Sequence, residues 1–347
     1  MLTGACISRA GLNRKTGLAT LTLVLAAEAP DLDILLYFRN PLTGFAHHRG
    51  LTHSFVGVPL VAAFVTALVY GFHRLRNNSR PAPAHAIRPR PRWGLLFIYA
   101  CLGGLSHILL DFTNSYGVRP LEPFSYRWHS WDIVSIVEPL ILLALIAGLG
   151  LPVLFGLISE EIGARHHGPR GRGAAIVALL AVVAVWGVRD YQHRHALAAM
   201  QSLLYHGAEP VRISAYPYAT NPFVWHGVVE TSDFFEMMQV DSLNSEVDPG
   251  GGSQTRYKPE ETAATLAAKK SNLGRVYLDW AAYPITEQEP QPEGGYVVRF
   301  YDLRYLYPER SSRPLSAVVQ LDPQLKVAAV SFAVRSQAPR VRVPTPR

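Results

Sequence analysis

The sequence predicts a mainly α-helical membrane protein, in which a multi-span bundle of about five helices is followed by a small α+β domain outside the membrane. Charged residues make up only 17% of the 347 residues, whereas soluble domains carry about 25%, and the mean hydropathy is +0.10. Apolar runs of membrane-spanning length fill the first half of the chain. Shorter strand-like runs fill the second half.

The predicted membrane domain, residues 1–188, contains five apolar segments. The first is interrupted by Glu28, Pro30, Asp31 and Asp33, so we expect it to be a weak or broken span. These acidic residues also argue against a cleaved signal peptide. The five segments are residues 16–38, 54–72, 94–110, 133–158 and 173–188.

Basic residues predict the orientation of the bundle. The loop 74–92 holds six arginines and no acidic residue, the loop 159–172 holds three arginines, and the N-terminus is also basic. By the positive-inside rule these parts face the cytoplasm, which predicts five spans with the N-terminus inside and the C-terminal domain outside. Because topology explains the net charge of +7, and the arginines lack interleaved aromatic residues, we expect no nucleic-acid partner.

The predicted outer domain covers residues 189–335. A helix-like stretch opens it at Asp190, a short helix is expected near residues 262–270, and a hairpin is expected to turn at Asp322 and Pro323. Residues 336–347 form a Pro- and Arg-rich tail that we expect to be disordered. The expected strands lie at residues 223–231, 275–283, 296–307 and 315–334.

Three polar motifs, PDLD, HRGLTH and SHILLD, are brought to the outer face by this topology. Each has an ordinary explanation when taken alone: solvated acids at a turn, a basic loop at the lipid headgroups, and a His–Asp pair at a helix end. Together they supply carboxylates and imidazoles, the mixture that binds zinc, manganese or iron. We therefore predict one or two divalent ions, zinc or manganese, bound by Asp31, Asp33, His48, His53, His107 and Asp111.

Two residues are predicted to take part in catalysis. Asp33, or its neighbour Asp31, is a candidate general base, and Arg49 is a candidate ligand for a substrate phosphate at the start of a helix that Thr52 or Ser54 caps. His47 is expected to be a bystander. Asp132 and Glu138 are weaker candidates to support the site, and Glu138 is equally expected to pair with an arginine such as Arg119 or Arg127.

The stretches APDLD, HHRGLTHS and SHILLDFTNSYGVRPLEPFS resemble the YdjM-like family of membrane-bound, metal-dependent hydrolases. The resemblance covers residues 2–145 closely. Members have been described as LexA-binding inner-membrane proteins and as hydrolases, and the family is thought to be related to zinc-dependent phospholipases C and nucleases. The resemblance thus implies a bacterial inner-membrane location and phosphoester hydrolysis, with membrane lipid as a partner. It also assigns the acids, the HRGxTH histidines and the HxxxD pair to the metal.

Family members usually carry a Thr-His pair before an LTG-like stretch, whereas this sequence begins MLTGACISRAG. Either the natural start lies upstream or this chain lacks one ligand. Two alternatives to an enzyme stay open. One is a membrane protein whose metal or ion-pair cluster only holds helices together while the outer domain binds a partner. The other is a transporter, which is disfavoured because the polar groups gather at one face and do not line a midplane path.

Overall fold

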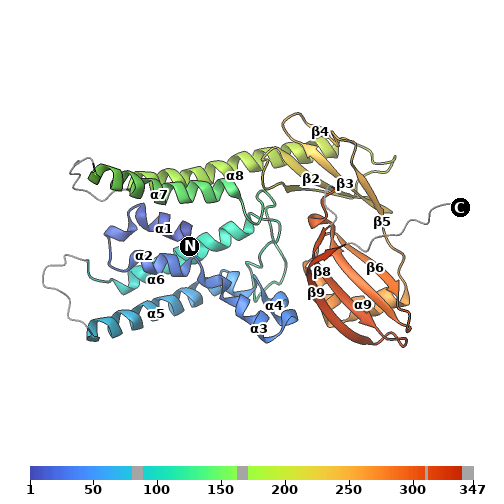
Figure 1. Cartoon of the computed structure of the whole chain (residues 1–347), viewed down its shortest axis with the longest axis horizontal. Helices are drawn as coiled ribbons and strands as arrows, with labels where there is room; N and C mark the ends of the chain where they lie inside the picture. Colours follow the sequence, from blue (N-terminus) through green and yellow to red (C-terminus); the bar gives the residue numbers. More distant parts are fainter. Residues whose placement is uncertain (80–88, 162–170, 309–311, 338–347) are drawn as a thin grey trace. The chain divides into compact units, whose positions relative to one another are not determined.

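The computed structural model describes residues 1–79, 89–161, 171–308 and 312–337 (Figure 1). The chain forms two compact units. The first comprises Met1–Arg39 and His47–Tyr191, and the second comprises Asn40–Ala46 and the chain from Gln192 onward. The first unit is helical and the second contains antiparallel sheets with short helices, which confirms the predicted fold class.

Long helices dominate the first unit. Four helices in the described part of the chain are long and apolar enough to cross a membrane. They accompany two short helices near the N-terminus, which pack against each other and against the long helix α6. The helices are α1 (Leu2–Arg9), α2 (Ala19–Ala26), α5 (Gly57–Ser79), α6 (Trp93–Phe112), α7 (Pro139–Glu161) and α8 (Arg172–Gln201).

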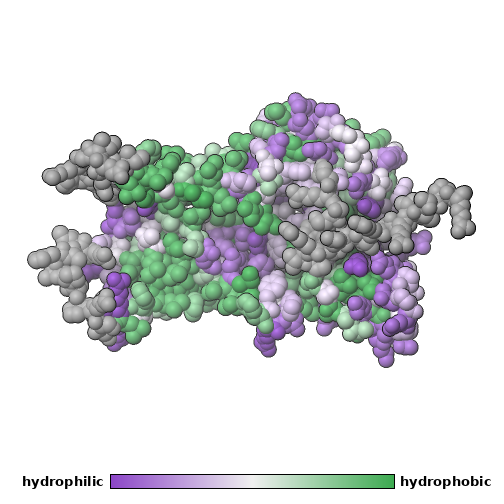
Figure 2. Space-filling view, viewed as in Figure 1, coloured by the Kyte–Doolittle hydropathy of each residue, from purple (hydrophilic) through white to green (hydrophobic). Residues whose placement is uncertain are grey.

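Large apolar side chains cover the outside of this unit, as the green surface over the long helices in Figure 2 shows. On α5, Leu60, Phe64, Leu68 and Phe72 follow one another at intervals of four residues and are 53–60% exposed. This spacing places them on one face of the helix. An exposed apolar stripe of this length is stable against lipid acyl chains and unfavourable in water.

The first apolar segment is broken where the sequence predicts. Helix α2 ends at Ala26, a 3-10 helix η2 runs over Ala29–Leu35, and the short helix α3 covers Leu36–Arg39. Pro30 lies in the first turn of η2, where it lacks an N–H to continue the hydrogen bonding of α2. The break turns the chain and places Asp31 and Asp33 beside the second polar motif.

Two basic residues at the end of the bundle away from the polar motifs donate hydrogen bonds to backbone carbonyls. Arg9 donates to the carbonyl of Leu149 at 2.8 Å, and Arg172 donates to that of Ala10 at 3.0 Å. These bonds join the end of α1 to the middle of α7 and to the start of α8. Several of the arginines used for the orientation lie outside the described residues: Arg80, Arg88, Arg165 and Arg170.

Helix α8 joins two parts that the sequence suggests separately. The predicted span 173–188 and the helix-like stretch from Asp190 form one helix of 30 residues. Inside it, Arg189 donates to both carboxylate oxygens of Glu138 at 2.9 and 3.0 Å. This pairing differs from the partners expected for Glu138, since Arg119 contacts Glu122 instead, at 3.4 Å.

The second unit contains two antiparallel sheets. The first sheet has the strand order β1-β2-β3-β4, and its fifth strand, β5, also pairs with β3. The second sheet has the strand order β6-β7-β8-β9. The hairpin predicted at Asp322 is present between β8 and β9. The strands are β1 (Arg212–Pro217), β2 (Val224–Glu230), β3 (Phe234–Asp241), β4 (Glu246–Val247), β5 (Gln254–Tyr257), β6 (Pro284–Pro290), β7 (Tyr296–Asp302), β8 (Ser312–Leu321) and β9 (Val327–Gln337).

Two helices pack with the second sheet. The helix predicted near residues 262–270 is α9 (Ala263–Lys270), which Thr262 caps. The strand predicted at residues 275–283 is wrong, because α10 (Asn272–Trp280) covers most of it. Its buried residues Leu273, Tyr277 and Trp280 recur at helical spacing, and this amphipathic face outweighs the strand preference of the aromatic residues. The predicted tail, apart from the end of β9, lies outside the described residues.

A short segment between two of the polar motifs belongs to the second unit. It forms most of α4 (Pro41–His47). Phe45 is buried there, with its ring 5.4 Å from that of Trp280 and 4.8 Å from that of Phe332. The apolar PLTGFA sequence, which carries no motif of its own, is therefore part of the core of this unit.

Candidate metal centre

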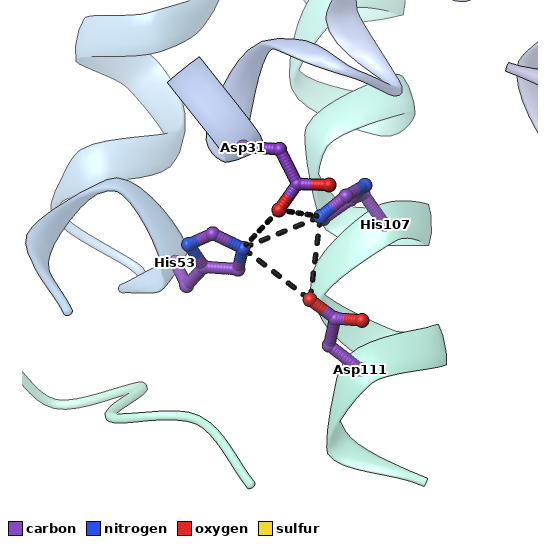
Figure 3. Close-up of side chains that lie close together, drawn as sticks. All are labelled: Asp31, His53, His107 and Asp111. Carbon is purple, nitrogen blue, oxygen red and sulfur yellow. Dashed lines mark hydrogen bonds and ion pairs between the residues drawn. The ribbon is translucent and has the colours of Figure 1, made fainter. Parts of the chain in front are cut away.

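Four side chains from three separate segments converge in the first unit (Figure 3). Asp31 comes from η2, His53 from the 3-10 helix η3 (Leu51–His53), and His107 and Asp111 from one face of α6. Each offers one nitrogen or oxygen atom, and all four atoms lie within 4.8 Å of one another. The predicted His107–Asp111 pair thus shares a helix face, as an i, i+4 spacing requires.

Five of the six distances between these four atoms match the spacing of ligands around a tetrahedral ion. His53 Nε2 lies 3.4 Å from Asp31 Oδ1, 3.3 Å from Asp111 Oδ2 and 3.3 Å from His107 Nε2. His107 Nε2 lies 3.4 Å from Asp31 Oδ1 and 3.3 Å from Asp111 Oδ2. Tetrahedral ligands at the usual zinc distances, about 2.0–2.1 Å, are about 3.3–3.4 Å apart.

Hydrogen bonds on the outer nitrogens orient both imidazoles. The Nδ1–H of His107 donates to the carbonyl oxygen of Ala27 at 2.8 Å, which leaves the lone pair of Nε2 facing the cluster. The Nδ1 of His53 lies 3.0 Å from the hydroxyl of Thr52, which itself donates to Asp33 Oδ2, and 3.4 Å from that carboxylate oxygen. A carboxylate or carbonyl on the second ring nitrogen is the usual arrangement of a histidine that binds a metal.

One oxygen in the cluster lacks a well-formed hydrogen bond. Among the described residues, Asp111 Oδ2 is buried and has no hydrogen bond of good geometry; its polar neighbours are the Nε2 atoms of His53 and His107, each 3.3 Å away, while its other oxygen contacts Arg49 at 3.0 Å. A buried carboxylate oxygen without a well-formed hydrogen bond is costly. A divalent cation between the four atoms satisfies this oxygen and both imidazole lone pairs, so the residues present fit a metal ion.

Asp33 and His48 lie beside the four-residue cluster. Asp33 accepts from the backbone N–H of Arg49 at 2.9 Å, from the Thr52 hydroxyl at 3.1 Å and from His48 at 3.0 Å. Asp31 and Asp33 therefore face the two opposite nitrogens of the His53 ring. The assignment of Asp33 and His48 as direct ligands stays a prediction. Both lie on the Nδ1 side of the His53 ring, away from the four-residue cluster.

Arg49 is buried, with a left-handed backbone φ of 55°. Its guanidinium contacts Asp111 at 3.0 Å and donates to the Asn114 side chain at 3.0 Å. Close packing disfavours a side chain at the following Gly50, since a Cβ there would lie 3.0 Å from the backbone oxygen of His47 and 2.6 Å from a carboxylate oxygen of Glu122. The role of Arg49 in binding a substrate anion stays a prediction, and its observed contacts orient Asp111.

The electrostatics of the cluster favour a cation. Burial alone would raise the pKa of Asp31 and of Asp33, yet hydrogen bonds with neighbouring histidines hold both pKa values well below their usual range. Burial alone would lower the pKa of His53, but contacts with Asp111, Asp31 and Asp33 raise it to about 10. A proton on His53 thus occupies the position that a metal ion takes.

The close approach of α2 and α6 sets the position of His107. A Cβ on Gly103 would lie 2.9 Å from the Cβ of Ala26, whereas a Cβ on Gly104 would lie 3.9 Å from its nearest neighbour. We expect Gly103→Ala to push α6 outward, to cost about 1–3 kcal/mol of stability and to weaken metal binding. Gly104→Ala is the matched control. Equal metal affinity and melting temperature in the two variants would refute this account.

The first part of the chain matches a known family over more than half of its length. The sequence model of the YdjM inner membrane protein family matches residues 1–196. The chain belongs to the YdjM inner membrane protein family. This finding confirms the resemblance seen in the three polar motifs, and it agrees with the four apolar helices in assigning the protein to a membrane.

Two further comparisons extend beyond the YdjM region. The YfhP C-terminal alpha/beta plait domain matches residues 263–336, which contain α9, α10 and the sheet β6–β9. The chain is 22% identical over 312 residues to the uncharacterized protein YfhP of Bacillus subtilis (strain 168), covering 87% of this chain and 81% of the relative. No solved structure matches.

Some supporting residues in this YdjM family member have no clear signal in the sequence. The carbonyl of Ala27 and the side chain of Asn114 hold His107 and Arg49, respectively. Ser54 was one of two candidate caps, and its hydroxyl accepts from the N–H of Gly57 at 2.9 Å. Thr52, the other candidate, instead binds Asp33. The sequence feature that could have indicated Asn114 is its position, since it is a polar residue three positions after Asp111.

Proposed function

We propose that this protein is a metal-dependent hydrolase that acts on a phosphoester at the outer face of the inner membrane. The observation that carries the proposal is the near-tetrahedral group of Asp31, His53, His107 and Asp111, with its unsatisfied carboxylate oxygen. Two imidazoles and two carboxylates suit zinc or manganese. Four ligands in one group support a single ion.

The chemistry can be divided among the residues of the site. A bound divalent ion supplies a Lewis acid for the phosphoryl oxygen and lowers the pKa of water. Asp31 is 44% exposed, so it is the ligand that a substrate or a water molecule reaches first. We assign the proton acceptor to Asp31 because Asp33 already accepts three hydrogen bonds and serves to orient His53. Arg49 positions Asp111.

The orientation of the site follows from the positive-inside rule. Arg90 and Arg92, which precede α6, lie at the bundle end opposite the cluster, and Arg9 and Arg172 are at the same end. We therefore place the cluster and the second unit outside the cytoplasm. The site then lies near the headgroups of the outer leaflet, where a phosphoester in a lipid headgroup is available.

A second function is a metal or ion-pair cluster that only holds the helices together, while the outer domain binds a partner. The observation that favours it is the completeness of the shell, since structural zinc sites use four protein ligands. In that case metal removal lowers the melting temperature and changes no hydrolytic activity.

The test combines metal analysis of the purified protein with a panel of phosphoester and phospholipid substrates. Our proposal predicts about one equivalent of zinc or manganese and metal-dependent release of phosphate or of a phosphorylated headgroup. Bound metal with no turnover of any substrate, together with a fall in melting temperature on chelation, would favour the structural function.

Asp33→Asn tests the support of His53. The amide keeps the size of the side chain but removes the negative charge opposite His53 Nδ1, so we expect metal affinity to fall about 10–100-fold with little loss of stability. Competition with a chelator measures the affinity. The exposed residue Asp233 in the second unit provides the control Asp233→Asn, for which no change in metal affinity is expected. An unchanged affinity in Asp33→Asn would show that this carboxylate does not support the metal.

Metal binding is expected to release protons. The pKa of His53 is raised to about 10 in the metal-free site, so its imidazole is protonated at neutral pH and has no lone pair for a metal at Nε2. If one proton is displaced, the apparent metal affinity rises by about tenfold per pH unit over pH 6–8. Calorimetry in buffers of different ionisation enthalpy counts the protons. An affinity independent of pH would contradict this linkage.

A further inference from the structure

A pocket of about 350 Å³ adjoins the metal centre in the first unit. Asp111 forms part of its wall, and Asn114 lies beside it. Most of the remaining wall is aliphatic and comes from the end of α6, the segment before α7, the first turns of α7 and the start of α1; Glu28 also lines it. It includes Leu110, Val134, Ile136, Ile141, Leu142 and Leu145.

The pocket reaches the lipid-facing surface of the unit. Ile136 is 51% exposed, Val137 62% and Leu142 38%, while Ile141 and Leu145 are buried deeper in the wall. These exposed residues begin the apolar face that α7 presents along its length. A hydrocarbon chain can therefore enter from the bilayer without crossing water.

The charged groups of the wall away from Asp111 are paired, beginning with the carboxylate of Glu28 and the amino group of Met1. One carboxylate oxygen of Asp111 contacts the guanidinium of Arg49, and the other faces His53 and His107. Glu138 also lines the pocket, but Arg189 neutralises its carboxylate. A ligand with an apolar chain and an anionic head fits this distribution, with its head beside Asp111 and the cation.

We propose that this pocket binds one hydrocarbon chain of a membrane phospholipid, so that the lipid phosphoester lies at the metal centre. The identification of the headgroup as substrate rests on the proposed function, whereas binding of the chain does not. The volume lies within the range of small-molecule sites, about 300–1,000 Å³. It is too small for a helix of a partner protein, since a helix with its side chains is about 10–12 Å wide.

Photo-crosslinking tests the proposal with full-length protein in phosphatidylcholine nanodiscs. The probe is phosphatidic acid with a diazirine at the end of one acyl chain, and mass spectrometry locates the labelled residues. We expect labelling to concentrate on Leu110 and residues 134–145. Leu142→Trp fills the pocket and is expected to lower this labelling at least about fivefold, because an inserted indole displaces the chain.

Leu143→Trp is the matched control. Leu143 is the next residue along α7, is 65% exposed and is not part of the pocket wall. Labelling in this variant is expected to stay within about twofold of wild type. Equal labelling of wild type and Leu142→Trp, or labelling spread evenly over the lipid-facing helices, would overturn the proposal.

A third variant separates this proposal from the proposed function. His53→Ala removes a metal ligand and leaves the pocket wall intact, so labelling of residues 134–145 is expected to persist while hydrolysis is lost. Pocket labelling in a wild-type protein that hydrolyses no phosphoester would support the chain site and reject the enzyme. Loss of pocket labelling in Leu142→Trp together with slower hydrolysis of long-chain lipids, but not of glycerol phosphate esters, would support both.

Discussion

Purified His53→Ala protein is expected to contain less than about a tenth of the metal of wild type and to show no hydrolysis. The His53 side chain is fully buried, and its Nε2 lies within 3.4 Å of the ligand atoms of Asp31, Asp111 and His107. Because loss of a mere supporting residue costs about 10–100-fold in affinity, loss of this central ligand is expected to cost more. Metal content after gel filtration and phosphate release are the two measurements.

His47→Ala is the control for this prediction. His47 lies in the same motif but outside the four-residue cluster, and it is exposed. Its removal is expected to leave metal content and activity unchanged. Wild-type metal content in His53→Ala, with normal folding, would contradict the assignment of the cluster as the metal centre.

Glu138→Ala is expected to lower the stability of the first unit by about 3–5 kcal/mol. The substitution leaves the buried guanidinium of Arg189, which is 1% exposed, without its carboxylate partner. Removing one member of a buried ion pair costs this much because the remaining charge is not solvated. The melting temperature in detergent, monitored by the exposure of buried cysteine to a thiol dye, reports the loss; Cys6 is fully buried in the same unit.

The double substitution Glu138→Leu/Arg189→Met provides the comparison. Replacing both charges by apolar groups of similar size is often neutral or stabilising, so we expect the double variant to be more stable than Glu138→Ala. A double variant as unstable as the single one would indicate that the pair contributes through something other than the balance of buried charge.

The residues of the candidate metal centre could be predicted from the sequence because their spacing and chemistry are local. His107 and Asp111 lie one helical turn apart, and the HRGLTH motif supplies His53 immediately before a long apolar helix. Which side chains face the ion could not be found in this way. Asp31 and Asp33 have the same chemistry, and only the path of η2 sends them to opposite nitrogens of His53.

Long-range pairings account for the rest of what the sequence left open. Glu138 and Arg189 are 51 residues apart, and several other arginines were equally suitable partners. The assignment of residues 40–46 to the second unit depends on Phe45 packing with aromatic residues more than 200 positions away. The pocket beside Asp111 is lined largely by ordinary aliphatic residues, which in sequence look the same as any lipid-facing helix.

X-ray absorption spectroscopy at the metal edge of the purified protein tests the central claim most directly. The four side chains predict about one metal per chain, with a first shell of two imidazole nitrogens and two carboxylate oxygens at about 2.0–2.1 Å. The imidazole contribution is expected to fall by half in His107→Ala, if that variant retains any metal. A protein without stoichiometric metal, or a metal with no imidazole ligand, would contradict the account.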